Sequence, residues 1–172
     1  HVFARTYEEH LRNEQIYSGL APAEERRDNH ERELALLIDM HVHTRRHSAC
    51  GRAEPHEMVA AAHRLGLDAL VFTEHHVVWG EEELAELQHE FPSIRLFTGV
   101  EISTEASGDL LVIGAEGTDW FAPRMPAEIA VEEAHARGGI VIAAHPYRAG
   151  YGTKGLDKLP LDAAEIYSLH MH

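Results

Sequence analysis

Residues 34–44, LALLIDMHVHT, join an apolar run to a group of titratable side chains. The run predicts a buried strand over residues 34–40, because continuous apolar strands are typical of sheets covered on both faces. Asp39, His41 and His43 stand at the carboxyl end of this strand. Residues i and i+2 of an extended segment point to the same side, so both imidazoles can face one ion. The stretch therefore predicts a strand that ends in two candidate metal ligands.

Short apolar runs continue to alternate with helical patterns along the chain. Helices are predicted over residues 55–66, 81–91 and 126–139, and the first has a proline suited to its first turn and a glycine at its end. Further strands are predicted at residues 67–72, 94–103, 109–115, 140–144 and 164–169. Repeated strand–helix units predict a parallel α/β fold or a barrel.

One domain is the default for 172 residues, and an apolar content of 44% is enough for a core. We expect residues 34–172 to form this domain, since the alternation of strands and helices begins there. Residues 1–33 are charged and poor in large apolar groups. They are expected to form a helical or poorly ordered lead-in, because charge runs of this kind are usually solvated surface.

Titratable residues follow other predicted strands at the corresponding place. Glu74 and His75 come directly after the second strand, Glu101 lies near the end of the third, and His145 follows IVIAA (140–144). Taken singly, His75 could be a buried residue of its loop and His145 a loop residue held by the next proline. A carboxylate within an apolar run, such as Glu101, is costly to bury unless it is paired or binds a metal. Because the carboxyl ends of strands build the active sites of barrel proteins, the four strand ends together predict a metal site.

The composition narrows the classes of function. The chain has 15 histidines, one cysteine and a formal net charge of −14 at pH 7. Long nucleic acid requires clustered lysine and arginine, so this charge argues against such a partner. One cysteine cannot form an internal disulfide, and no apolar stretch reaches the roughly 20 residues that span a bilayer. We therefore expect a cytoplasmic protein without a membrane segment. Seven histidines are expected on the surface: His1, His10, His30, His56, His63, His89 and His135.

Four motifs, in this order, resemble the polymerase and histidinol phosphatase (PHP) superfamily. They are DMHVHT (39–44), TEH (73–75), GVEIS (99–103) and IVIAAHP (140–146). The resemblance covers roughly residues 34–170. It implies a distorted (βα)7 TIM-like barrel with a two- or three-metal site that hydrolyses phosphoesters.

The resemblance also implies roles for single residues. His41, His43 and Glu101 would hold one ion, Glu101 would bridge to a second ion shared with His145, and His75 would bind a third. The cofactors would thus be two or three divalent cations, drawn from Mn, Zn, Fe and Mg.

Several positions depart from the family pattern. Glu74 stands where the family usually has aspartate. His47 is the nearest donor after the His-x-His pair, and Asp109 stands where small members often have histidine, so both are candidate metal ligands. A carboxylate at this place favours Mg or Mn. Asp39 would orient a ligating imidazole from behind.

The last family motif, an Asp-x-His near the end of the barrel, is not found in these 172 residues. We therefore expect the barrel to be incomplete at its carboxyl end, with the last strands missing. His170 and His172 have the spacing of a ligand pair, and they are either late ligands or an accident of the end.

The expected reaction is hydrolysis of a small phosphorylated substrate, either a phosphomonoester or a nucleotide, by a metal-activated water. Glu101 and Arg148 are the candidate catalytic residues, because a guanidinium suits the geometry of a phosphate. Two alternatives stay open. One is a non-catalytic PHP scaffold or regulatory domain. The other is an amidohydrolase-type metal hydrolase, although the only lysines, Lys154 and Lys158, lie in a glycine-rich loop.

Overall fold

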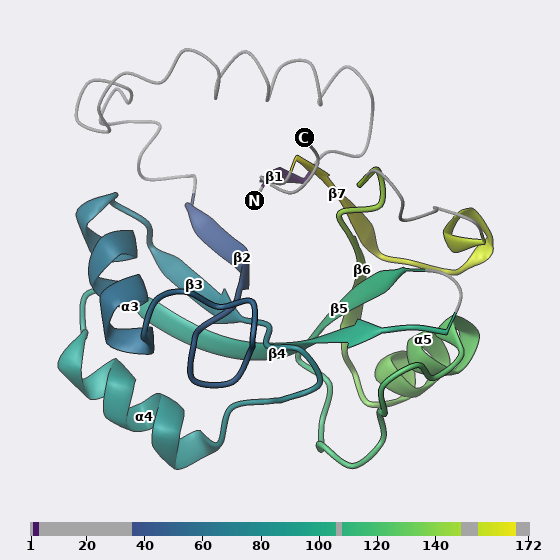
Figure 1. The fold of residues 1–172 in the computed structure, drawn as a ribbon, viewed down its shortest axis with the longest axis horizontal. Helices are drawn as coiled ribbons and strands as arrows, with labels where there is room; N and C mark the ends of the chain where they lie inside the picture. The colour runs from purple at the N-terminus through teal and green to yellow at the C-terminus, as the bar shows by residue number, and fades with distance from the viewer. Residues whose placement is uncertain (1, 4–35, 106–107, 149–154, 168–172) are drawn as a thin grey trace.

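A computed structural model describes residues 2–3, 36–105, 108–148 and 155–167, and Figure 1 shows its fold. The helical elements are α3 (Pro55–Arg64), α4 (Glu81–Glu90), α5 (Ala127–Ala136) and the short 3-10 helix η2 (Leu156–Lys158). The strands are β1 (Val2–Phe3), β2 (Ile38–Val42), β3 (Ala69–Phe72), β4 (Arg95–Ser103), β5 (Asp109–Ile113), β6 (Ile140–Ala144) and β7 (Ala163–Tyr167). Every predicted helix and strand is present, with bounds that differ by a few residues. The predicted lead-in, except for β1, and the pair His170 and His172 lie outside the described residues.

The strands form one sheet in the order β1-β7-β6-β5-β4-β3-β2. β2, β3 and β4 run parallel to one another, and β6 runs parallel to β7. Figure 1 shows the sheet curled into half of a barrel, with α3, α4 and α5 outside the curl. Within the described ranges β1 and β2 are the two edges of the sheet, so a half-barrel of mixed α/β type is observed and a closed (βα)7 ring is not.

β5 corrects the prediction of a parallel sheet, because it runs antiparallel to both β4 and β6. The physical reason lies in the connection between β4 and β5. Thr104 donates from both its backbone N–H and its hydroxyl to the carbonyl of Gly108, at 3.0 and 2.6 Å. A connection this short makes a tight turn, whereas a parallel crossover needs a dozen residues or more. As a result, Asp109, the first residue of β5, lies at the edge of the sheet where β4 and β6 end.

β2 starts later than the predicted strand at residues 34–40. Asp39 and His41 therefore lie within the strand and His43 directly after it. The pairing of β2 with β3 changes register between Asp39 and Val42. An irregularity of this kind re-aims side chains, and it is common beside functional sites.

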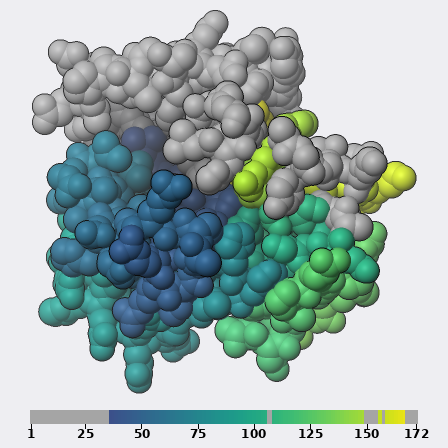
Figure 2. Space-filling model, viewed as in Figure 1, coloured from purple at the N-terminus to yellow at the C-terminus, as the bar shows by residue number. Residues whose placement is uncertain are grey.

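The described chain has two large apolar cores and a small third cluster, in which Met40 of β2 packs against Leu111 and Ile142. The first joins α3 and α4 to β2 and β3 and draws its buried residues from positions 42–96. The second joins α5 to β4, β5 and β6 and draws its buried residues from positions 100–156. Figure 2 shows the blue-to-teal first half and the green second half on opposite sides of the view. None of the helices described is long and apolar enough to cross a membrane.

Candidate metal centre

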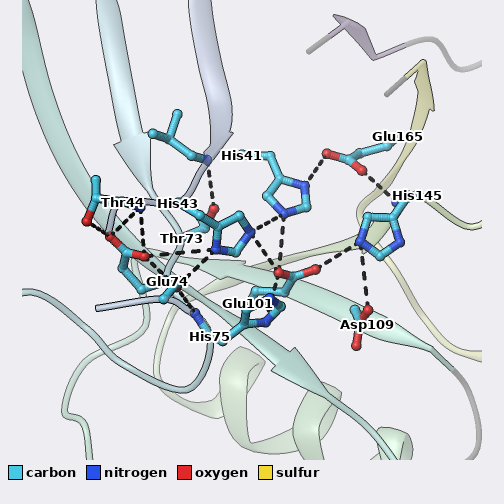
Figure 3. Close-up of polar contacts among 12 residues, drawn as sticks. His41, His43, Thr44, Thr73, Glu74, His75, Glu101, Asp109, His145 and Glu165 are labelled. Carbon is cyan, nitrogen blue, oxygen red and sulfur yellow. Dashed lines mark hydrogen bonds and ion pairs between the residues drawn. The ribbon is translucent and has the colours of Figure 1, made fainter. Parts of the chain in front are cut away.

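The carboxylate of Glu101 lies among four imidazole rings (Figure 3). Its Oε2 is 2.9 Å from Nε2 of His43, 3.1 Å from Nδ1 of His75 and 3.3 Å from Nε2 of His41. Its Oε1 is 3.1 Å from Nε2 of His145. The ring nitrogens Nε2 of His41 and His43 are 2.8 Å apart. The structure thus brings together five residues that the sequence predicts as ligands, and we name this group the histidine cluster.

Backbone pairing places His75 over β4. The backbone N–H of Glu101 donates to the carbonyl of Glu74 at 2.9 Å, and the N–H of His76 donates to the carbonyl of Glu101 at 2.9 Å. His75 and Glu101 accordingly form a parallel bridge beyond the end of β3. The ladder between β3 and β4 is therefore what aims the His75 ring at the Glu101 carboxylate.

His145 approaches the cluster from the end of β6. Its φ of 31° is a conformation that residues other than glycine rarely adopt. Glu165 of β7 holds it there, because its Oε2 accepts a 2.5 Å hydrogen bond from the backbone N–H of His145. Asp109 lies on the other side, with its Oδ2 3.7 Å from Nε2 of His145. The antiparallel course of β5 thereby brings Asp109 to the margin of the cluster.

Glu165 also contacts the ring of His41. Its Oε1 is 2.8 Å from Nδ1 of His41, and its side chain is fully buried. An ionised carboxylate only accepts hydrogen bonds, so the contact keeps a proton on Nδ1 and directs Nε2 toward Glu101. This is the arrangement that carboxylates form behind metal-ligating histidines.

The charges of the cluster are strongly coupled. Burial disfavours a charged His41 ring, but the carboxylates of Glu101 and Glu165 outweigh burial and raise its pKa from 6.5 to about 10. Burial also opposes ionisation of Glu101, yet its contacts with His145, His41 and His43 hold its pKa well below the usual range. Without a cation, a proton on His41 must therefore balance the buried carboxylates.

The donor atoms of the cluster fit divalent cations. Oε2 of Glu101 is buried, and among the residues described it accepts no hydrogen bond of ordinary geometry, although three ring nitrogens surround it. Donor atoms that lie within 4.8 Å of one another form two groups. The inner group is His41, Glu101 and His145, and the outer group is His43, Cys50 and His75. Imidazole and carboxylate suit Zn, Fe and Mn, and a cation would supply the positive charge that the proton on His41 otherwise provides.

Glu74 anchors the loop that follows β2. Its fully buried carboxylate accepts hydrogen bonds from the backbone N–H of Thr44 at 3.1 Å and from the hydroxyls of Thr44 and Ser48 at 2.5 Å. Oγ of Ser48 in turn accepts from the backbone N–H of His75 at 3.1 Å and lies 3.2 Å from Nδ1 of His43. Through Ser48, Glu74 therefore positions the ring of His43 and the backbone of His75.

His47 is placed apart from the cluster. Its Nε2 is 3.0 Å from Oε1 of Glu83, and its ring meets the edge of Trp79 at a centroid distance of 5.1 Å. The structure brings this residue into neither group of donor atoms. Its role as a metal ligand stays a prediction without geometric support.

Asp39 and Arg148 lie beside the cluster. Oδ1 of Asp39 accepts a 3.2 Å hydrogen bond from the backbone N–H of His41. Its expected role in orienting a ligating imidazole stays a prediction. The backbone N–H of Arg148 donates to the carbonyl of His145 at 2.9 Å. The predicted phosphate contact of Arg148 stays a prediction. Of the histidines expected on the surface, those in the described ranges are exposed: His56, His63, His89 and His135.

Sequence reasoning did not single out Glu165, which contacts His41 and His145, or Cys50, whose thiol lies in the outer group. The signal for Glu165 was available, because it is a carboxylate within the apolar strand AEIY, as Glu101 is within GVEIS. Cys50 carried no such signal, since a single cysteine in a polar loop has no pattern.

The fold is a curled α/β half-barrel, and the histidines at its strand ends surround a glutamate. This arrangement is able to hold metal ions. The family model of the PHP domain matches residues 39–151, and the chain belongs to this family, as its motifs predicted. An uncharacterized protein of Methanocaldococcus jannaschii is 27% identical over 148 residues, which cover 78% of this chain and 83% of the relative.

Two solved structures share the fold. A candidate metal-dependent phosphoesterase from Bifidobacterium adolescentis superposes with a TM-score of 0.60 at 16% identity, over 77% of this chain and 78% of that one. A two-domain protein from Bacteroides vulgatus superposes with a TM-score of 0.53 at 24% identity. It is described as containing a PHP-like metal-dependent phosphoesterase. That match covers 78% of this chain and 40% of the Bacteroides chain. At these identities the likeness concerns the fold.

Proposed function

We propose that the protein is a metal-dependent hydrolase of a small phosphoester, either a phosphomonoester or a nucleotide. One observation carries this proposal: four imidazoles from the ends of three strands, β2, β3 and β6, converge on the buried carboxylate of Glu101. Membership of the PHP family supports the choice of reaction, as do the solved relatives described as candidate phosphoesterases.

His41, Glu101 and His145 would hold the inner cation. Divalent cations in such a site supply an activated water and positive charge for the phosphoryl oxygens. Glu165 holds the proton of His41 on Nδ1, and it fixes the backbone of His145. One carboxylate therefore holds both the ring of His41 and the backbone of His145. Glu101 stays ionised at neutral pH because its pKa is low.

The small size of the proposed substrate follows from charge. The formal net charge of −14 repels a polyanion along most of its length, whereas two or three cations reverse the field only locally. Arg148, a half-buried residue three positions after His145, is proposed to bind a phosphate oxygen.

Removal and restoration of metal test the proposal. The chelated protein should lose hydrolysis of a phosphomonoester or nucleotide, and added Mn or Zn should restore it. Activity that is indifferent to the chelator contradicts the proposal. Amides and lactones in the same assay test the amidohydrolase alternative. A protein that elemental analysis finds free of metal would favour the scaffold alternative.

A further inference from the structure

We propose that the thiolate of Cys50 is a metal ligand of the outer group, where it completes a second cation site with His43 and His75. This inference rests on the proposed metal site and adds a donor of a different chemical kind. The three side chains offer donor atoms that all lie within 4.8 Å of one another. The rings of His43 and His75 stack with centroids 4.5 Å apart, so their nitrogens reach the same region.

A second observation marks this place as a cation site. Oε2 of Glu101 is buried and accepts no hydrogen bond of ordinary geometry from any residue in the described ranges. It lies 2.9 Å from Nε2 of His43 and 3.1 Å from Nδ1 of His75, while Oε1 faces His145 in the inner group. A buried carboxylate oxygen without a donor is costly unless a cation meets it. Oε1 of Glu101 thus faces the inner group, whereas Oε2 lies between the His43–His75 pair and His41.

The backbone of the loop explains why Cys50 stands beside the rings. A Cβ on Gly51 would lie 2.1 Å from the carbonyl carbon of Thr44, so only glycine allows this approach. The N–H of Gly51 donates to the carbonyl of Ser48 at 2.9 Å, and the N–H of Ser48 donates to the carbonyl of Thr44 at 3.0 Å. The loop thereby folds back on the residue that follows His43 and presents Cys50 at its tip.

The donor set has a consequence for metal preference. A thiolate with two imidazoles is a soft set that favours Zn or Fe, whereas carboxylate-rich sites favour Mg or Mn. Asp109 lies at the inner group, beside His145. We therefore expect the outer position to be selective for Zn or Fe, with harder cations accepted only at the inner one. Cys50 is exposed, so a cation there can be reached from solvent.

Cobalt(II) tests this inference independently of activity, because a cobalt–thiolate bond gives a near-ultraviolet charge-transfer band. Chelated protein is loaded with Co, and the band is compared in the wild type, in Cys50→Ser and in His47→Asn. The wild type and His47→Asn should show the band, because His47 is paired with Glu83 outside the outer group. Cys50→Ser should lose the band, bind fewer cobalt ions per chain and bind Zn at least about 10-fold more weakly.

Thiol labelling gives a second measurement, since Cys50 is the only cysteine. Zn should slow alkylation of Cys50 in the wild type, and the His75→Asn variant should lose this protection. A wild type that binds cobalt and hydrolyses phosphoester, but shows no thiolate band and no protection, overturns the inference and leaves the proposed function intact. A protein that binds no metal overturns both.

Discussion

Oε1 of Glu165 lies 2.8 Å from Nδ1 of His41, while Nε2 of the same ring faces Glu101 at 3.3 Å. The ring thus lies between two buried carboxylates: Nδ1 keeps its proton toward Glu165, and Nε2 is the nitrogen that can give up its proton to a cation beside Glu101. A residue near the end of the described chain therefore determines which nitrogen of a residue in β2 is offered to a cation.

Glu165→Gln should weaken metal binding by about 10- to 100-fold, the usual cost of losing a partner behind a metal-ligating histidine. The new amide also presents an NH2 group either to the ring or to the N–H of His145. Competition with a metal-sensitive dye measures the affinity for Zn. Asp162→Asn is the matched control, since Asp162 also accepts from a backbone N–H, that of Val141, and pairs with His135, but away from the cluster. Equal affinities in the two variants would show that Glu165 does not position the ring.

Metal binding should release a proton from His41. The pKa of His41 in the folded protein, about 10, lies above its ordinary value of 6.5. The protonated ring therefore stabilises the metal-free protein fully below pH 6.5, and this stabilisation is lost as the pH rises toward 10. Because a cation must displace that proton, its apparent affinity should rise by up to about tenfold per pH unit across the same window.

The measurement is the Mn affinity at several pH values, combined with proton release in weakly buffered solution. His41→Asn should bind more weakly and show a flatter pH dependence than the wild type. A wild-type affinity that does not change with pH would contradict a displaced proton.

Glu101→Gln should reduce kcat/KM for a phosphomonoester by more than about 100-fold, which exceeds the usual cost of losing a residue behind the ligands. The reason is that one carboxylate faces both groups of donor atoms. Metal content and a thermal unfolding curve, measured on the same preparation, separate loss of cations from loss of fold. Glu83→Gln is the control, because Glu83 pairs with His47 and should leave kcat/KM nearly unchanged.

The strand-end residues show what a sequence can predict about such a site. His41, Glu101 and His145 were identifiable because each stands in or directly after an apolar run, and strand ends meet at one edge of a sheet. Their partner Glu165 is 124 positions from His41, and no local pattern links the two. The contact requires both the pairing of β6 with β7 and the curl of the sheet that turns β7 toward β2, and a single sequence specifies neither.

The loop after β2 and the course of β5 escaped prediction for the same kind of reason. His47 was singled out as the nearest donor after the His-x-His pair, and nothing in the spacing shows that Gly51 folds back on Thr44 and brings Cys50 to the outer group. The apolar run of β5 is as continuous as those of its neighbours, so it did not indicate direction. The turn closed between Thr104 and Gly108 decides the direction, and with it the position of Asp109.

Glu74→Gln should destabilise the metal-free protein by about 3 kcal/mol, the cost of leaving buried donors facing an amide instead of a carboxylate. Those donors belong to Thr44, Ser48 and Trp79. Urea unfolding in the presence of a chelator measures the change without a contribution from bound metal. Glu82→Gln, at an exposed position on α4, should change the free energy of unfolding by less than about 0.5 kcal/mol. A similar small change in Glu74→Gln would show that the buried network does not hold the loop.

The division of the apolar interior at about residue 100 has a consequence for cooperativity. Each of the two large cores takes its buried residues from its own half of the described chain, β4 passes from one to the other, and only the small cluster around Leu111 and Ile142 reaches across, to Met40. The ligand set takes His41, His43 and His75 from the first half and Glu101 and His145 from the second. A bound cation would thus cross-link the two halves, and it should raise and sharpen the calorimetric unfolding transition, which should broaden when the cation is withdrawn.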